Sequence, residues 1–327
     1  MRRTERHTIP SEMRAVAIDR FGPPSVLRSH ILPVPELGPR ELLIALYAAG
    51  VGSWDESMRD GSWKVGRTKF PFVIGTDGAG IVVATGARVT RFRVGERVYA
   101  ASSDIPRGGF YAQYVAVSES HVARMPSSLD FLHAAAVAYP GLTALRGVNE
   151  VLGIRRDETI LIFGASGAVG TLAVQFAKHR GARVIATASG RAAQSIVRRL
   201  GAAAVVDARK PSIVDQLLEL APDGIDGLLA FAGGDELERC LPFIRNGGRV
   251  AYPNGVEPEP GHRRGIRFRS YDAKNDARAL SRLNRAVNAM RLRVPIAATF
   301  PLARAADAHR RQREHAIGRI VLRIRRA

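Results

Sequence analysis

The first third of the chain alternates short apolar segments with glycine and proline. Between residues 14 and 126, β-branched and aromatic residues form runs that turn-forming residues interrupt every few positions. Such runs predict the short strands of a barrel or a sandwich rather than helices. The clearest expected strands cover residues 41–52, 78–86, 93–101 and 112–117.

From about Leu129 the pattern changes to strands that alternate with helices. Residues 159–165 form a continuous apolar segment, and residues 170–181 have the composition of a helix that ends beside Gly181. This alternation predicts a parallel sheet whose strands are connected by crossover helices. Further strands are expected at 183–189, 204–208, 227–233 and 248–254, and further helices at 194–202, 212–220 and 235–244.

The C-terminal part of the chain is predicted to form a strand, two helices and a closing strand. Asn275 and Asp276 precede a segment whose apolar residues recur at helical spacing, so they are expected to cap a helix. The other expected elements are a strand over 265–274, a helix over 305–316 and the closing strand over 318–326.

The composition is that of a globular protein with about two domains. The chain has 327 residues, of which 46% are hydrophobic and 24% charged. A single cysteine, Cys240, excludes an internal disulfide framework and is typical of a reducing compartment, so we expect a cytoplasmic protein. No apolar run reaches the roughly 20 residues that span a bilayer, and the charged N-terminal segment lacks the apolar stretch of a signal peptide. We therefore expect no membrane association.

Most of the net charge of +19 lies in the last fifth of the chain. From residue 262 onward there are 18 basic and four acidic side chains, a net charge of +14. A basic segment of this kind is compatible with RNA or single-strand binding, which we keep as the alternative function. However, the arginines of the helix after Asp276 mostly avoid its apolar stripe, as on a solvated face. We therefore do not expect nucleic acid as a partner.

The strongest local motif is a glycine-rich turn between the strand at 159–165 and the helix that follows. Glycines at 164, 167 and 170 permit a tight turn, a close approach of the backbone to a pyrophosphate, and close packing of helix on strand. The N-terminus of the helix adds free N–H groups and a partial positive charge. An ordinary glycine-rich turn is the alternative. We predict a dinucleotide whose pyrophosphate is bound by Ser166, Gly167, Ala168, Val169 and Gly170.

The end of the second strand indicates which dinucleotide binds. An NAD enzyme usually carries an acid there, and that acid would repel a 2′-phosphate. This chain has no carboxylate between the glycine turn and Asp207. Instead, Ser189 can donate a hydrogen bond to a phosphate and Arg191 can form a charge-assisted pair with it. These two residues predict NADPH as the cofactor, with a solvated arginine at the start of a helix as the alternative for Arg191.

Several other chemistries lack their sequence patterns. Ser166 is not in a nucleophile elbow, and no Gly-Lys-Ser/Thr follows the glycine turn. The eight histidines include no HxxxH or HExxH pair, so metal-ligand spacing is absent and each is expected at the surface or satisfied in the core. The Tyr-x-x-x-Lys pair that characterises short-chain reductases is also missing. No metal, nucleophile or acid–base pair is evident.

The chain resembles the medium-chain dehydrogenase/reductase superfamily, specifically its zinc-independent quinone oxidoreductase (zeta-crystallin-like) branch. The resemblance extends over nearly the whole length from Met13 to Arg325. The segments that carry it cover residues 48–61, 71–100, 108–117, 134–145, 164–187 and 301–324. The resemblance implies an α/β fold, in which a Rossmann doubly wound parallel sheet is inserted into a GroES-like β-barrel catalytic domain. We accordingly expect the first part of the catalytic domain at 1–127, the NADP-binding domain at 128–265, and a return segment at 266–327.

The same resemblance implies a site without zinc. Zinc-dependent relatives have a cysteine where this chain has Gly52, and a Gly-His-Glu sequence where it has Gly75, Thr76 and Asp77. The cysteine-rich structural loop is missing near residues 103–109. We therefore expect neither a catalytic nor a structural zinc ion.

Further site residues are implied by position within the family. On the cofactor side these are Thr143, Phe231, Ala232, Gly233, Tyr252 and Asn254. Substrate contacts are expected from Ser53, Trp54 and Trp63, although the two tryptophans could equally pack the rim of the barrel. Tyr139 could donate a proton at the nicotinamide end, but a core tyrosine is the preferred interpretation.

The expected reaction is direct hydride transfer from NADPH to a quinone or an α,β-unsaturated carbonyl. A site without a metal suits this chemistry, because the cofactor supplies the reactive hydride while the protein orients the reactants and excludes water. A polyketide-type enoyl reductase module is a weaker third possibility. The family also implies a homodimer, for which the strand that begins at residue 265 is the expected contact.

Overall fold

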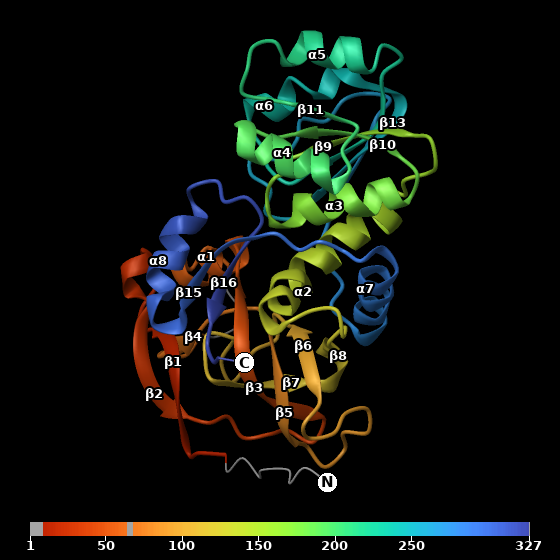
Figure 1. Cartoon of the computed structure of the whole chain (residues 1–327). Coiled ribbons are helices and arrows are strands. Elements are labelled where there is room, and N and C mark those ends of the chain that lie inside the picture. Colours follow the sequence, from red (N-terminus) through yellow and green to blue (C-terminus); the bar gives the residue numbers. More distant parts are fainter. Residues whose placement is uncertain (1–8, 64–67, 327) are drawn as a thin grey trace. The chain divides into compact units, whose positions relative to one another are not determined.

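The computed structural model describes residues 9–63 and 68–326, which divide into two compact units (Figure 1). Unit 1 contains the described residues up to Tyr139, the segment Asn275–Asn284 and the residues from Ile296 onward. Unit 2 contains Pro140–Lys274 and Arg285–Pro295. The chain thus passes between the units four times, whereas the sequence places the domain limits at 127/128 and 265/266.

Unit 1 is built on two sheets of mainly antiparallel strands. The larger has seven strands in the order β15-β16-β3-β5-β6-β8, with β7 paired to β3. The smaller has the order β2-β1-β4. The predicted short strands are confirmed, since β-branched and aromatic residues fill the core between glycine-rich turns. The strands are β1 (Glu12–Ile18), β2 (Arg28–Pro33), β3 (Glu41–Val51), β4 (Phe72–Val73), β5 (Asp77–Thr85), β6 (Arg97–Ala101), β7 (Tyr114–Ser118), β8 (Val122–Arg124), β15 (Ile296–Pro301) and β16 (Arg319–Arg323).

The strand β16 lies inside the larger sheet of unit 1, between β15 and β3. β16 pairs with β3 in antiparallel register, Ile320 opposite Val51, and with β15 in parallel register. Helix α8 (Ala305–Gln312) packs on β15 and β16 and ends four residues before the predicted limit at 316. Helix α1 (Ser53–Asp60) follows β3 and ends at Gly61, whose φ of +85° favours glycine. Short 3₁₀ turns complete the unit: η1 (Pro24–Val26), η2 (Glu119–His121) and η5 (Leu302–Arg304).

Unit 2 contains the predicted parallel sheet. Its six strands have the order β11-β10-β9-β12-β13-β14, and every pair is parallel. This is the strand order of a Rossmann fold. The chain adds strands on one side of β9 up to β11, and then adds β12, β13 and β14 on its other side. The last strand, β14, forms one edge of the sheet, but the predicted homodimer contact through it stays a prediction. The strands are β9 (Thr159–Phe163), β10 (Arg183–Thr187), β11 (Ala204–Val206), β12 (Ile225–Ala230), β13 (Ile244–Pro253) and β14 (Arg267–Tyr271).

Crossover helices connect the strands of unit 2, and one of them is shorter than predicted. The prediction of a helix over 235–244 is wrong. Helix α6 covers only Asp235–Glu238, and a 3₁₀ turn, η4 (Leu241–Phe243), follows it. Pro242 has no N–H to donate, which ends the α-helical hydrogen bonding. The other crossover helices are α3 (Ala168–His179), α4 (Arg191–Leu200) and α5 (Ile213–Leu220).

Two helices belong to both units. Helix α2 (Phe131–Arg146) continues into a π-helical turn, η3 (Gly147–Val151), and contains Pro140. The sequence analysis predicts no helix at 131–146, and a proline inside a helix is uncommon because it removes one hydrogen bond. Helix α7 (Ala277–Met290) begins as predicted, with the Asp276 carboxylate accepting the Ala279 N–H at 2.8 Å. Across the described residues, no helix combines the length and apolar composition needed to cross a membrane.

Candidate active site

The glycine turn of unit 2 has the geometry of an open phosphate-binding loop. A Cβ atom on Gly170 would meet the Gly164 carbonyl oxygen at 2.3 Å, so helix α3 packs on the turn only because residue 170 is glycine. Gly167 differs, because a Cβ there would meet just one atom within 4 Å, the same Gly164 oxygen at 3.6 Å. The turn is therefore tight on its inner side and open above Gly167, where the N-terminus of α3 begins. This shape fits a bound pyrophosphate.

The predicted cofactor residues lie at one edge of the parallel sheet. Gly164, Ser189 and Phe231 each follow the carboxyl end of a strand, namely β9, β10 and β12. Phe231 lies against the glycine turn, since a Cβ on Gly164 would meet the Phe231 Cβ at 3.4 Å and the Ala232 nitrogen at 3.6 Å. The structure thus brings these three segments together at the edge where open α/β sheets bind ligands.

Other predicted cofactor residues belong to the same edge but have protein partners. At the end of β13, the Asn254 side chain donates to Asp272 at 2.8 Å, and the Tyr252 hydroxyl donates to Glu259 at 3.3 Å. Thr143, on α2, is buried, and its carbonyl oxygen accepts a hydrogen bond from the Tyr271 hydroxyl at 3.2 Å. Gly233 lies shortly after β12, and Ala168 is the first residue of α3.

A carboxylate from the end of β11, Asp207, lies beside the end of β10, where the sequence alone did not place it. The Ser189 hydroxyl donates to Asp207 Oδ1 at 2.7 Å, because the following strand, β11, brings Asp207 alongside. Arg191 is exposed as the first residue of α4. A 2′-phosphate here would therefore meet one arginine and one nearby carboxylate. The two groups have opposite effects on the choice between NADPH and NADH.

In unit 1, two of the three predicted substrate residues are neighbours. The rings of Trp54 and Trp63 lie 5.3 Å apart at 59°, and both are partly buried. Trp63 also packs against the main core of the unit, as the structural interpretation of these tryptophans expects. Ser53 is exposed at the start of α1. Tyr139, the candidate proton donor, is only half-buried, and its backbone N–H donates to Asp77 Oδ2 at 3.1 Å.

A buried ion pair lies against Gly50 and Gly52, which precede the predicted substrate residues of α1 in the chain. Arg319 of β16 donates from Nη2 to both carboxylate oxygens of Asp77, at 2.9 and 3.2 Å. Strand β3 runs between β16 and β5, so the arginine side chain has to cross β3 to reach Asp77. It does so over Gly50 and Gly52, where a Cβ atom would meet the guanidinium nitrogens at 2.6 and 2.5 Å.

A chain of hydrogen bonds converges on a second buried carboxylate, Asp55. Arg59 donates from Nη1 to His309 Nδ1 at 2.9 Å, and since arginine is only a donor, the histidine proton is on Nε2. That Nε2 donates to the Tyr111 hydroxyl at 3.0 Å, and the hydroxyl donates to Asp55 Oδ2 at 3.2 Å. The Gly52 N–H also donates to Asp55, at 2.8 Å. Asp55 therefore fixes the turn that carries Ser53 and Trp54.

Burial changes the titration of this cluster, which we call the Asp55–Arg319 cluster and which comprises Asp55, Arg59, Asp77, Tyr111, His309 and Arg319. Burial raises the pKa of Asp55 to about 7, although Arg319 and the Gly52 N–H act in the opposite direction. Burial likewise raises the pKa of Asp77. Desolvation together with the charge of Arg59 lowers the pKa of His309 to about 3, so this histidine is neutral. The cluster can hold a proton at Asp55 near neutral pH.

Sequence reasoning did not find this cluster. Asp55 and His309 are 254 positions apart in the chain, and neither has a local motif. His309 is 1% exposed with both ring nitrogens bonded, which confirms the expectation of a satisfied core histidine. Within residues 9–63 and 68–326, no group of three or more His, Cys, Asp or Glu side chains is arranged to hold a metal ion.

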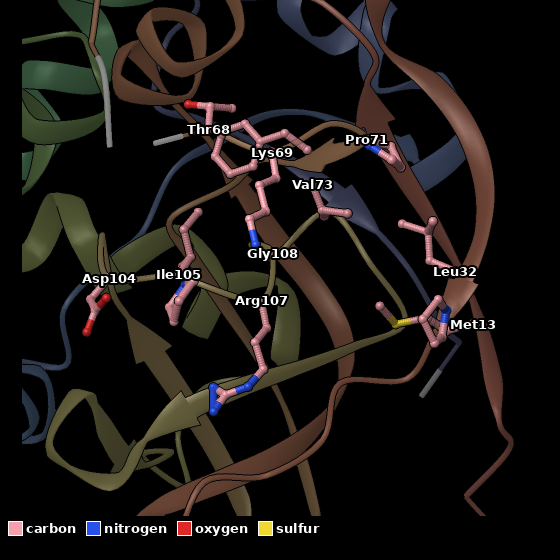
Figure 2. Close-up of a pocket in the computed structure, with 13 residues that line it drawn as sticks. Met13, Leu32, Thr68, Lys69, Pro71, Val73, Asp104, Ile105, Arg107 and Gly108 are labelled. Atoms are coloured by element: carbon pink, nitrogen blue, oxygen red, sulfur yellow. The ribbon is translucent and has the colours of Figure 1, made fainter. Parts of the chain in front are cut away.

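A separate pocket of about 720 Å³ lies elsewhere in unit 1. Figure 2 shows Met13 and Leu32, from β1 and β2, on one side of it and the loop that carries Asp104 and Gly108 on the other. Its lining includes none of the predicted substrate residues and no member of the Asp55–Arg319 cluster. It is therefore separate from the candidate site.

Comparison with known proteins identifies both units. Residues 38–127 match the model of the alcohol dehydrogenase GroES-like domain, and residues 168–260 match that of zinc-binding dehydrogenases. The human quinone oxidoreductase is 33% identical over 73% of this chain and 72% of its own length. An NADPH-dependent alkenal/one oxidoreductase of Arabidopsis thaliana chloroplasts is 30% identical over 96% of this chain and 80% of its own length.

Solved structures agree with this assignment. The quinone oxidoreductase from Coxiella burnetii superimposes with a TM-score of 0.87 at 28% identity, covering 96% of this chain and all of that one. An NAD-dependent alcohol dehydrogenase superimposes with a TM-score of 0.88 at 30% identity and the same coverage. The expected α/β fold, with a Rossmann sheet and a GroES-like barrel, is confirmed. The comparisons give no support to the nucleic-acid alternative. The chain belongs to the medium-chain dehydrogenase/reductase superfamily, in its quinone oxidoreductase branch.

Proposed function

We propose that the protein is a zinc-independent, NADPH-dependent oxidoreductase that transfers a hydride to a quinone or an α,β-unsaturated carbonyl. The observation that carries this proposal is the Arg319–Asp77 pair beside Gly52. By family resemblance, position 52 is a zinc ligand in the metal-dependent relatives. Here the Arg319 guanidinium fills the space that a side chain at position 52 would need. A positive charge therefore lies beside the position that carries a zinc ligand in those relatives.

The residues of unit 2 would hold the cofactor. The open turn at Gly167 and the N-terminus of α3 would bind the pyrophosphate, and Arg191 would pair with a 2′-phosphate. Phe231 and Ala232, which lie against the turn, would border the dinucleotide. When bound, the nicotinamide supplies the hydride. We propose NADPH because Arg191 is exposed and forms no ion pair with a described carboxylate, so its charge is available to a phosphate.

The residues of unit 1 would position the acceptor. Ser53 and Trp54 lie on the turn that Asp55 fixes through the Gly52 N–H, and Trp63 packs against Trp54. The exposed Ser53 hydroxyl can donate a hydrogen bond to the acceptor oxygen, where negative charge develops. Asp55 itself is fully buried, so we assign it a positioning role rather than contact with substrate.

The decisive experiment is an acceptor screen with purified protein. We expect NADPH oxidation with simple quinones and enones, little turnover with alcohols and NADP⁺, and no stoichiometric zinc by metal analysis. Turnover restricted to alcohols, or zinc bound at one ion per chain with loss of activity on its removal, would overturn the proposal. Ser53→Ala is the matched substitution for the acceptor contact, and Ser62→Ala, an exposed serine beyond the end of α1, is its control.

We also propose that the enzyme is a cytoplasmic homodimer. The edge strand β14 supports this assembly, because its free side can pair with the same strand of a second copy. Sedimentation at micromolar concentration should give about twice the mass of 35.4 kDa. A proline at an exposed position of β14, as in Arg269→Pro, should shift the protein toward the monomer.

A further inference from the structure

A pocket of about 600 Å³ in unit 2 is lined by basic side chains and no acidic one. It lies where helices α3, α4 and α7 end, and its lining includes residues from the last turn of each. The glycine turn is at the opposite end of α3, about 18 Å away for a helix of 12 residues. This basic pocket is therefore separate from the cofactor turn. Its polar lining residues are Gln175, Lys178, His179, Arg199, Arg291 and Arg293.

The sequence segments that line the pocket also contain basic residues without acidic ones. The two stretches that line it, residues 175–200 and 289–293, contain eight Lys and Arg residues and no Asp or Glu. None of the basic lining residues forms an ion pair with a described carboxylate. A surface that only needed solubility would mix both signs, as the rest of the chain does.

Helix dipoles do not neutralise this charge. Three helix C-termini contribute about −0.5 each, or about −1.5 in total. The pocket has four side chains with a formal positive charge, Lys178, Arg199, Arg291 and Arg293. A net charge of about +2.5 therefore remains, which complements a ligand with two or three negative charges.

The wall of the pocket is held in place by buried hydrogen bonds. Gln175 is 9% exposed, and its side chain bonds the backbone of Arg293 twice, donating to the carbonyl at 2.8 Å and accepting the N–H at 2.9 Å. Gly201 lets the Lys178 side chain lie against the end of α4, because a Cβ there would meet the Lys178 Cδ at 2.2 Å. Gln175 of α3 thus holds the segment after α7 in place, and Gly201 leaves room for the Lys178 side chain beside α4.

One basic residue of the pocket, Arg291, lies at a backbone position that favours glycine. Arg291 has a φ of +48° directly after α7, where a helix commonly ends in glycine. A non-glycine residue in this conformation is strained. The strain places a guanidinium at the pocket, whereas glycine would end the helix at a lower energetic cost.

From these observations we infer that the basic pocket binds a small, multiply charged phosphate compound, at a site distinct from that of the dinucleotide. The four cations provide charge-assisted hydrogen bonds to phosphate oxygens, and arginine is suited to bidentate contacts with them. The ligand class is a soluble compound with a pyrophosphate or two phosphate groups.

Calorimetric titration with inorganic phosphate, pyrophosphate and tripolyphosphate tests this inference. We expect pyrophosphate to bind more tightly than phosphate, and Arg199→Gln to weaken its binding about tenfold. Arg198→Gln is the matched control, because it removes the same charge from the adjacent exposed residue of α4, which does not line the pocket. It should change the affinity less than about twofold. Both side chains are exposed, so the fold should be unaffected.

Three results would overturn the inference. The first is the absence of pyrophosphate binding to the unmodified protein at millimolar concentration. The second is equal weakening by both substitutions, or tighter binding of a single-stranded RNA that both weaken equally, which would indicate a diffuse basic surface. The third is loss of pyrophosphate binding in Gly167→Ala but not in Arg199→Gln, which would place the ligand at the cofactor turn.

Discussion

The guanidinium of Arg319 occupies the space that any side chain at position 52 would require. A Cβ atom on Gly52 would lie 2.5 Å from Arg319 Nη1, and the same guanidinium is bonded to the buried Asp77. Arg319 is only 8% exposed, so it has little freedom to withdraw. The glycine at 52 and the arginine at 319 are therefore coupled, although 267 positions separate them.

This coupling predicts a non-additive pair of substitutions. Gly52→Ala should lower the free energy of unfolding by about 1–3 kcal/mol, because the added methyl overlaps the fixed guanidinium. In an Arg319→Ala background the same change should cost far less, since the obstructing group is gone. Urea denaturation of both single variants and the double variant measures the coupling. Strictly additive effects would show that the guanidinium moves aside freely.

The raised pKa of Asp55 predicts a pH-dependent contribution to stability. The carboxyl has a pKa of about 7 in the folded protein and 3.8 when unperturbed, so the folded state holds the proton more tightly. Stability due to this group is therefore greatest below pH 4 and falls as the pH rises to 7, by at most about 1.4 kcal/mol per pH unit. Asp55→Asn should remove this slope, as shown by denaturation curves between pH 4 and 8. Asp60→Asn, at the exposed end of α1, is the control and should leave it unchanged.

His309 should produce the opposite slope in part of the same range. Its pKa is about 3 in the folded protein and 6.5 when unperturbed, so unfolding takes up a proton between these values. Stability due to this group is complete above pH 6.5 and is lost as the pH falls toward 3. His309→Gln retains an acceptor for Arg59 and should become less sensitive to acid than the unmodified protein. If His179→Gln, at an exposed position, had the same effect, the burial of His309 would not be the cause.

Gly167 provides a test of the cofactor turn that does not depend on stability. A Cβ at this position meets no protein atom closer than 3.6 Å, so Gly167→Ala should change the free energy of unfolding by less than about 1 kcal/mol. The methyl group would nevertheless occupy the face on which we place the pyrophosphate, so the Kd for NADPH should rise at least about tenfold. Fluorescence titration measures the Kd. Unchanged affinity would mean that the dinucleotide does not approach Gly167.

The choice between the two nicotinamide cofactors should respond to Arg191 and Asp207 in opposite directions. Arg191→Ala removes the cation and should lower the ratio of kcat/KM for NADPH over NADH about tenfold. Asp207→Asn removes the carboxylate that Ser189 bonds, and should raise the same ratio. Arg198→Ala, at the other end of α4, should leave the ratio unchanged. If Arg191→Ala left the ratio of kcat/KM for NADPH over NADH unchanged, the proposed phosphate contact would be contradicted.

The sequence predicts the parallel sheet and its cofactor turn well, because their signals are local. The apolar strand, the glycines at 164, 167 and 170 and the following helix are contiguous, so one short segment defines the motif. The helix at 131–146 was missed, and it contains Pro140, a residue that normally signals a helix end. In that helix, tertiary packing outweighs the local preference of proline.

The Asp55–Arg319 cluster could not be read from the sequence, and neither could Asp207 beside Ser189. Each depends on which strands become neighbours: Arg319 meets Asp77 because β16 and β5 flank β3, and Asp207 meets Ser189 because β11 follows β10 in the sheet. The charged residues themselves carry no spacing signal. Pairing across a sheet decides their partners, and it is fixed only when the strand order is known.

The position of β16 has a consequence for biosynthesis. The six strands of unit 2 are contiguous between residues 159 and 271, so the ribosome can release them as a set that pairs immediately. The strand β16 of unit 1 emerges only after about 270 residues have followed its partner β3. Until then Asp77 has no arginine to neutralise it. A nascent or truncated chain that lacks β16 therefore contains an uncompensated carboxylate, which is paired only once Arg319 has been synthesised.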